Sequence, residues 1–306
     1  MNYLKSAISF KSEDHNCAGR LYIPLTASAI HPCVVMANGF SGTMDWILPG
    51  FADAFSSNGF AVLIFDYRHL GESEGEPRQL IDPERQLTDL RNAIRFARQH
   101  NKIDPNKIAL WGTSLGGSYI LSLAAEDESF AAVIGNMPAI DAVKGANVKA
   151  KMKKTGATNL DLVSTSLRLL AVAAYDNLRG ILSLSPSYIK VYGEPGKAFF
   201  TDPALASRFE FVAKNSPTWQ NKVAARFLFK APRYREGTFE KIRAPIMLTL
   251  ATDDVEVSTS FIKRKAKNAA SVKIMEYPYG HFDLYHGEVF KTVVADQISF
   301  LRKYLG

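Results

Sequence analysis

The sequence predicts an α/β fold, a mostly parallel, twisted sheet with helices packed on both faces. Apolar runs typical of buried strands alternate with amphipathic helical segments along residues 31–138, and again along 245–305. A serine between two glycines, in Gly112-Thr113-Ser114-Leu115-Gly116, stands between one such strand and the next helix. Because each helix returns the chain across a face of the sheet, this alternation is typical of parallel strands.

The first half of the chain supplies most of the predicted sheet. Strand-like runs at 7–10 and 19–23, joined by a polar turn, predict an antiparallel hairpin. Buried strands are expected at 31–37 and 60–65, separated by a helix over 46–57 that stops at Asn58-Gly59. A long amphipathic helix is expected from Pro83 to about His100. The strand at 108–111 then leads to the serine turn and its helix, and a buried strand follows at 130–134.

The alternation is interrupted between about Ala139 and Phe239. This stretch has helical periodicity over 160–182, 205–213 and 219–228, and no buried strand stands out in it. The sheet resumes with strands at 245–250 and 272–277, a helix over 261–270 between them, and a final helix over 288–305. We therefore expect a core domain made of residues 1–138 and 241–306, and an inserted helical lid made of residues 139–240.

The bulk composition is that of an ordinary globular protein, with 47% hydrophobic and 22% charged residues. No apolar run is long enough to cross a bilayer, and the first residues lack the apolar block of a signal peptide. We therefore expect a cytoplasmic protein with no membrane span. Cys17 and Cys33 are expected to be buried thiols, because two cysteines without a metal-ligand spacing fit that role better than a disulfide framework.

The net charge of +7 is concentrated in one segment. Residues 141–240 contain 10 Lys and 6 Arg against 8 Asp and Glu, which leaves the rest of the chain at −1. Lysines 144, 149, 151, 153 and 154 cluster there without the interleaved aromatic residues that stack on bases. We expect a solvated basic face and no nucleic-acid partner; attraction of an anionic substrate is the alternative.

Ser114 is the expected nucleophile. A serine on a sharp turn between a strand and a helix projects its hydroxyl, and the strained turn leaves room only for small residues two positions away, here Gly112 and Gly116. A serine hydroxyl becomes reactive only when a histidine takes its proton, and that histidine needs a carboxylate to orient it.

His281 is the expected base because, of the six histidines, it alone follows the last predicted strand on a glycine turn. For the acid, Asp253 and Asp254 end the preceding strand, and Asp141 follows the strand after the serine helix. The residues alone favour one of the adjacent pair over Asp141. The amides of Leu115 and Phe40 are expected to bind the substrate oxyanion.

These residues resemble the α/β-hydrolase superfamily over nearly the whole chain. The order Ser114, Asp254, His281 is that of its nucleophile, acid and histidine, so the resemblance favours Asp254 as the acid. The turn Asp66-Tyr67-Arg68 with Gly71-Glu72-Ser73 is similar to the Asp-x-Arg-Gly-x-Gly-x-Ser stretch of the superfamily. Within it, the chain resembles capped serine esterases related to dienelactone hydrolases and X-prolyl peptidases.

The resemblance implies hydrolysis of an ester, amide or thioester through an acyl-enzyme, with no metal and no organic cofactor. Two positions depart from the pattern. Asn38 replaces the histidine usual before the oxyanion glycine, and Ser114 replaces the cysteine of dienelactone hydrolases proper, which favours ordinary esters.

We therefore expect a serine hydrolase of the carboxylesterase type, acting on a small to medium, largely apolar ester or other acyl substrate. The alternatives are an acyltransferase, or a thioesterase or peptidase with the same triad. A non-catalytic binding module should lack part of the triad, and none is missing. The sequence is compatible with a homodimer.

Overall fold

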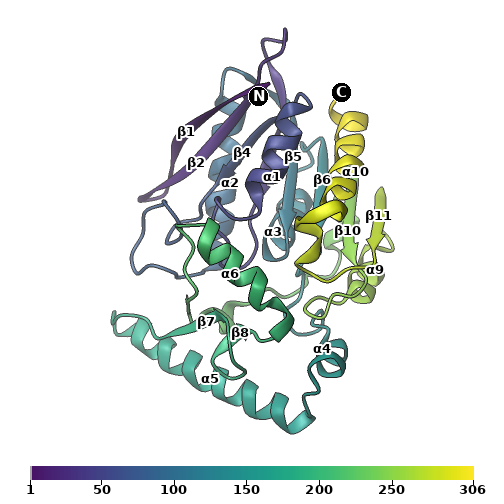
Figure 1. The fold of residues 1–306 in the computed structure, drawn as a ribbon. Helices are drawn as coiled ribbons and strands as arrows, with labels where there is room; N and C mark the ends of the chain where they lie inside the picture. The colour runs from purple at the N-terminus through teal and green to yellow at the C-terminus, as the bar shows by residue number, and fades with distance from the viewer. Residues whose placement is uncertain (1) are drawn as a thin grey trace.

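An eight-stranded sheet forms the centre of the protein in the computed structural model, which describes residues 2–306 (Figure 1). The strand order is β1-β2-β4-β3-β5-β6-β10-β11. β1 (Tyr3–Ser12) and β2 (His15–Pro24) form the predicted antiparallel hairpin, and β2 is also antiparallel to β4 (Ala61–Phe65). The other neighbours are parallel; they are β3 (His31–Ala37), β5 (Ile103–Thr113), β6 (Ala132–Asn136), β10 (Ile246–Ala251) and β11 (Val272–Tyr277). The predicted fold class is confirmed.

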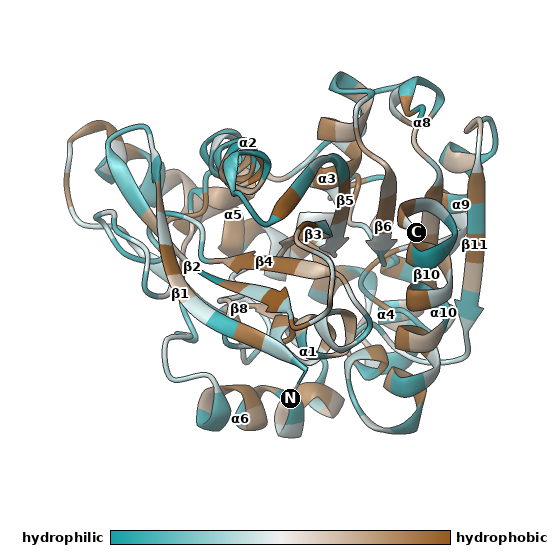
Figure 2. Cartoon of the chain, turned by 90° about the horizontal axis from the view of Figure 1, so that it is seen from above, coloured by the Kyte–Doolittle hydropathy of each residue, from teal (hydrophilic) through white to brown (hydrophobic). Residues whose placement is uncertain are grey.

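Helices cover both faces of this sheet (Figure 2). α1 (Leu48–Ser57) and α10 (Gly287–Leu305) pack on one face, and α2 (Pro83–Gln99) and α3 (Leu115–Glu126) pack on the other, where α8 (Thr238–Lys241) contacts α3. α9 (Thr259–Ala266) connects β10 to β11. Every residue of β4, β6 and β10 is buried, which explains why these strands are mostly apolar rather than alternating.

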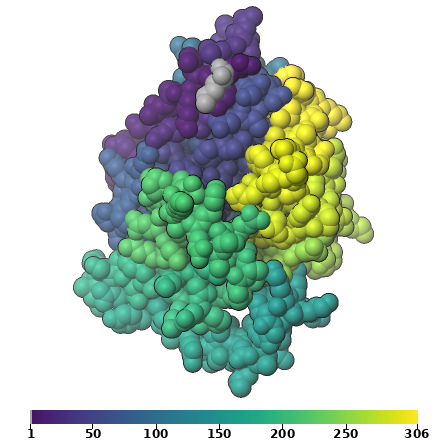
Figure 3. Space-filling view, viewed as in Figure 1, coloured from purple at the N-terminus to yellow at the C-terminus, as the bar shows by residue number. Residues whose placement is uncertain are grey.

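The segment between β6 and β10 contains helices close to the predicted ones over 160–182 and 205–213. Its helices are α4 (Val148–Thr155), α5 (Asn159–Ile181), η1 (Pro203–Leu205), α6 (Ala206–Asn215), α7 (Phe227–Lys230) and α8. In the space-filling view this segment, coloured teal to green, forms the lower part of the molecule and meets the C-terminal residues in yellow (Figure 3).

The same segment contains a small sheet that the sequence analysis missed. β7 (Tyr188–Tyr192) pairs with β8 (Ala198–Phe200) and with β9 (Val223–Ala224). The predicted helix over 219–228 was therefore wrong, because Val223 and Ala224 pair with β7 and the helix begins only at Phe227. Strands of two to five residues are too short to show the alternation that distinguishes a strand from a helix.

Two smaller expectations concern the whole chain. Cys17 and Cys33 are both buried and free, as predicted. None of the helices within residues 2–306 combines the length and the apolar composition that a membrane span requires.

Candidate active site

Ser114 lies on a strained turn between β5 and α3. Its backbone angles are φ 50° and ψ −117°, which a non-glycine residue adopts only under constraint. A Cβ added to Gly112 would lie 2.5 Å from the carbonyl oxygen of Gly116, and one added to Gly116 would lie 2.3 Å from that of Ala37. The glycines of the motif are thus required by close backbone approaches, which hold the start of α3 against the end of β3.

The loop after β3 lies against this turn. A Cβ at Gly39 would come within 3.3 Å of the Ser114 Cβ, so the two backbones are close neighbours. Asn38 is buried and closes the loop: its Oδ1 accepts from the Gly39 amide at 2.9 Å, and its Nδ2 donates to the Thr43 carbonyl at 2.6 Å. Asparagine at this position therefore anchors the loop by two local hydrogen bonds.

The expected oxyanion donors lie on this loop and at the start of α3. Leu115 is the first residue of α3, so its amide has no acceptor within the helix. Among residues 2–306, the Phe40 amide donates to no other residue. Both amides are available to a ligand at Ser114.

Asp66 fixes the far side of the same loop. Its Oδ1 accepts from the Met44 amide at 2.7 Å, and its Oδ2 accepts from the Glu72 amide at 2.8 Å. Burial raises the pKa of this carboxyl group to about 7, although the hydrogen bonds from the two backbone amides lower it. The turn at 66–73 thus supports the loop that carries Phe40.

His281 and Asp254 form a buried pair. The Nδ1 atom of His281 lies 2.6 Å from Oδ2 of Asp254, and the two side chains are 4% and 1% exposed. Oδ1 of Asp254 accepts from the amides of Glu256 and Val257, each at 2.8 Å, which fixes the carboxylate. Because Nδ1 is engaged, Nε2 is the ring nitrogen of His281 left for Ser114.

The other two acidic candidates lie elsewhere. Asp253 is exposed, although its backbone amide donates to the Tyr279 carbonyl. The carboxylate of Asp141 accepts from the amides of Val143, Lys144 and Tyr234, so it organises the start and end of the inserted segment. Of the three candidates, the structure brings only Asp254 to His281.

The electrostatic environment of His281 favours its charged form. Burial by itself lowers the pKa of the imidazole, but the charge of Asp254 and the hydrogen bond to it outweigh that effect. The net result is a pKa above the ordinary value of 6.5. The pair therefore suits a base that becomes an imidazolium while the carboxylate stabilises it.

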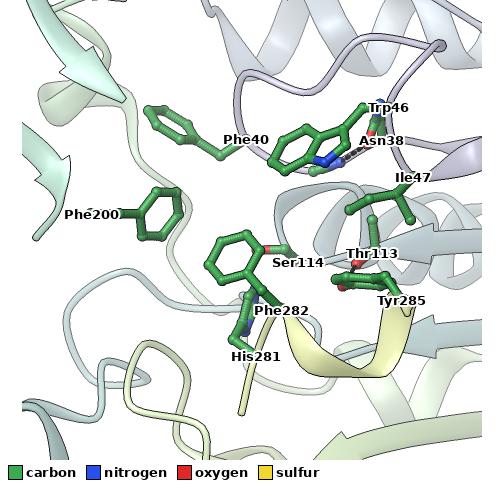
Figure 4. A pocket seen from close by; sticks show the side chains of 11 residues that line it. Asn38, Phe40, Trp46, Ile47, Thr113, Ser114, Phe200, His281, Phe282 and Tyr285 are labelled. Carbon is green, nitrogen blue, oxygen red and sulfur yellow. Dashed lines mark hydrogen bonds between the residues drawn. The ribbon is translucent and has the colours of Figure 1, made fainter. Parts of the chain in front are cut away.

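Ser114 and His281 line one pocket with largely aromatic walls (Figure 4). The cavity has a volume of about 20 Å³, which is room for about one water molecule. Its apolar walls are the side chains of Phe40, Trp46, Ile47, Phe200 and Phe282. Of the inserted segment, only Phe200 reaches the pocket.

A buried polar network that the sequence analysis missed supports the strand ends. Gln297 of α10 accepts from Trp111 Nε1 at 2.9 Å and donates to Asn136 Oδ1 at 2.7 Å and Thr249 Oγ1 at 3.1 Å. Gln297 thereby links β5, β6 and β10 close to the turn that carries Ser114. The only sequence signal is a glutamine on the buried face of an amphipathic helix.

The remaining histidines lie outside this pocket, and His69 sits at a positive φ of 68° in the turn after β4. Within residues 2–306, no three His, Cys, Asp or Glu side chains are grouped as metal ligands. Ser114, His281 and Phe40 thus meet at one pocket, with Asp254 behind His281 and the Leu115 amide beside Ser114.

Comparison with known proteins agrees with this architecture. A family model described as serine aminopeptidase, S33, matches residues 28–286. The quorum-quenching protein AidA of Acinetobacter baumannii (strain MDR-ZJ06) is 36% identical over 298 residues, which cover 97% of this chain and 94% of the relative. The polyketide transferase ATR5 of Stachybotrys chlorohalonatus is 28% identical over 283 residues, which cover 90% and 89%.

The fold recurs in a solved structure. The α/β hydrolase GrgF from Penicillium sp. sh18 matches with a TM-score of 0.77 and 24% identity, and 99% of each chain is covered. The narrower resemblance to dienelactone hydrolases and X-prolyl peptidases stays a prediction.

Proposed function

Because the chain belongs to the serine aminopeptidase S33 family of α/β-hydrolases, we propose that it is a serine hydrolase that cleaves an apolar carboxylic ester through an acyl-enzyme. The observation that carries this proposal is the constellation at the pocket. A serine on a strained turn lines the same pocket as a buried histidine whose Nδ1 atom is hydrogen-bonded to a buried carboxylate. No metal or organic cofactor enters the reaction.

The proposed mechanism assigns one role to each group. Ser114 Oγ attacks the substrate carbonyl carbon while His281 Nε2 takes its proton, and Asp254 stabilises the imidazolium. The amides of Phe40 and Leu115 bind the oxyanion of the tetrahedral intermediate. His281 then gives the proton to the leaving alcohol, and a water activated by the same histidine releases the acid and restores Ser114.

The substrate class follows from the pocket walls. They are aromatic or aliphatic, and a hydrophobic wall selects for apolar groups on the acyl or alcohol side. A space of about 20 Å³ cannot hold an ester, so the walls have to move apart before the substrate enters. The family description names an aminopeptidase, but no Asp or Glu lines the pocket to bind an amino terminus. We therefore favour an ester over a peptide.

Residues 139–240 act as a lid in this proposal. The ring of Phe199 lies 4.4 Å from that of Phe40, and the ring of Phe200 stands perpendicular to that of Phe282 at 5.2 Å. The inserted segment thus contacts both the loop that carries the oxyanion donor and the loop that carries His281. Displacement of Phe199 and Phe200 would open the pocket from the side of β8.

The inserted segment also makes polar contacts with the loop at 38–46, which carries Phe40. Asp45 Oδ2 accepts from the amide and the hydroxyl of Thr218 at 3.1 and 2.9 Å. The hydroxyl of Ser216 donates to the Asp45 carbonyl. Movement of the lid is therefore linked to the loop at 38–46.

Acyl transfer is the second candidate. A relative named a polyketide transferase covers 90% of this chain. Apolar walls that open for the substrate and then close over the acyl-enzyme would keep bulk water away and favour a bound alcohol, amine or thiol acceptor. The same Ser114 chemistry serves both reactions, so the identity of the acceptor decides between them.

The test is turnover of p-nitrophenyl esters of increasing acyl length by the protein and by Ser114→Ala. We expect turnover that is lost in Ser114→Ala, with an optimum at short to medium chains. Product analysis with an added alcohol, amine or thiol distinguishes transfer from hydrolysis. Absence of turnover with every ester, thioester and acceptor would contradict the proposed function.

A further inference from the structure

The outer face of α5 is an apolar stripe that no other segment within residues 2–306 covers. Ala173 and Asp176 are the only fully buried residues of this 23-residue helix. In Figure 1, α5 runs along the lower edge of the molecule, remote from the central sheet. Six large aliphatic side chains on it are between 45% and 76% exposed; they are Leu160, Val163, Leu167, Leu170, Leu178 and Ile181.

These positions recur at intervals of three and four residues, so they lie on one side of the helix. The exposed residues Ala171 and Ala174 complete the stripe between Leu170 and Leu178. Ala173 and Asp176 point the opposite way, where Asp176 accepts from the Arg226 guanidinium at 2.8 and 3.0 Å. The helix is thus anchored by one face and presents an uncharged apolar stripe on the other.

The stripe is symmetric about the point between Leu170 and Ala171. Each residue of the stripe has another apolar stripe residue at the same distance on the other side of this point, so an antiparallel copy of the helix would match the stripe along its length. The matched pairs are Leu160 with Ile181, Val163 with Leu178, Leu167 with Ala174, and Leu170 with Ala171. In the two middle pairs a leucine meets an alanine, which allows large side chains to pack into the spaces beside small ones.

We propose that α5 is the dimerisation helix of this protein, and that two copies pack their α5 helices antiparallel across a two-fold axis between Leu170 and Ala171. The six large side chains expose on the order of 700 Å² per copy, near the roughly 800 Å² per partner of a standard interface. An apolar patch of this size on a soluble protein marks an interaction site.

A lipid surface is the other candidate for this stripe, and the charges of α5 disfavour it. Helices that lie on membranes are rich in Lys and Arg along the polar face and in large residues along the apolar face. The polar side of α5 carries Arg168, Arg179 and Asp161, and two of the four middle positions of the stripe are alanines. A second copy fits the pattern better than a bilayer does.

Sedimentation and light scattering of the full chain test the proposal. We expect a dimer at micromolar concentration. Leu170→Glu places two carboxylates beside the axis and removes two buried leucines, so it should raise the dimer dissociation constant at least about 100-fold. Ser166→Glu, an exposed change on the same helix outside the stripe, should leave the dimer intact. Circular dichroism checks that each variant is folded.

A charge exchange tests the register. Leu167→Lys and Ala174→Glu should each dissociate the dimer, whereas the double variant should restore it, because each lysine would then face the partner's glutamate. Oxidised Ala171→Cys should give a covalent dimer and Ser166→Cys should not; the buried Cys17 and Cys33 do not interfere.

A wild-type monomer at high micromolar concentration, or a dimer unaffected by Leu170→Glu, would overturn the proposal. A monomer that binds anionic lipid vesicles through Leu170 would assign the stripe to a lipid surface instead.

Discussion

The close approach of α3 to the end of β3 makes Gly116→Ala a sensitive test of the active-site geometry. The added Cβ would lie 2.3 Å from the Ala37 carbonyl oxygen and 2.4 Å from that of Asn38, whereas real Cβ atoms keep at least 3.0 Å. Both contacts are with backbone, so α3 and the loop at 38–40 have to separate by about 0.7 Å, and displacements near 1 Å cost about 10²-fold in rate.

The separation would move the amide of Leu115 away from that of Phe40. These two amides are the donors of the proposed oxyanion hole. We expect kcat with a p-nitrophenyl ester to fall about 10- to 100-fold, while KM changes less, because the wall residues Phe200 and Phe282 lie outside the displaced loop. Gly135→Ala is the matched control, since its Cβ would meet Leu248 at an ordinary 3.4 Å. Unchanged kcat in a folded Gly116→Ala variant would refute the reasoning.

Three further changes test other parts of the structure. With Asp254→Asn, kcat/KM should fall about 10³- to 10⁴-fold. The pH below which activity is lost should also move down, because protonated His281 is inactive and its burial, which lowers its pKa, is no longer opposed by the charge of Asp254. Gln297→Leu leaves the buried Trp111 N–H without an acceptor, so the free energy of unfolding measured with urea should fall by about 2–4 kcal/mol. Phe200→Ala should shift the ester preference toward longer acyl chains, by about fourfold in kcat/KM for each methylene newly buried; an unchanged chain-length profile would contradict the proposed lid contact.

The sheet was predictable from the sequence because its central strands are buried on both faces and read as unbroken apolar runs. The serine turn was predictable for a different reason. The backbone contacts around Gly112 and Gly116 leave no room for a side chain, so only glycine fits at these positions and the motif indicates the turn. His281 could be identified by its place after the last strand. Choosing Asp254 over Asp253 required the resemblance, because adjacent residues at a strand end differ only in the direction of the side chain.

Features that depend on contacts between distant segments were not predictable. The strands β7 to β9 are too short to show a period, and Gln297 reveals its role only through partners on β5, β6 and β10. The apolar periodicity of α5 predicted a helix correctly but not where its apolar residues lie. A helix with one apolar stripe has the same pattern whether that stripe meets the core, a pocket or a partner, and most of the large apolar residues of α5 are exposed.

The measurement that tests the central claim most directly is intact-protein mass spectrometry after reaction with a fluorophosphonate. We predict one covalent adduct on Ser114, formed by the folded protein and absent from the folded Ser114→Ala variant. An adduct that persists in Ser114→Ala, or folded wild-type protein that forms none, would contradict the acyl-enzyme mechanism.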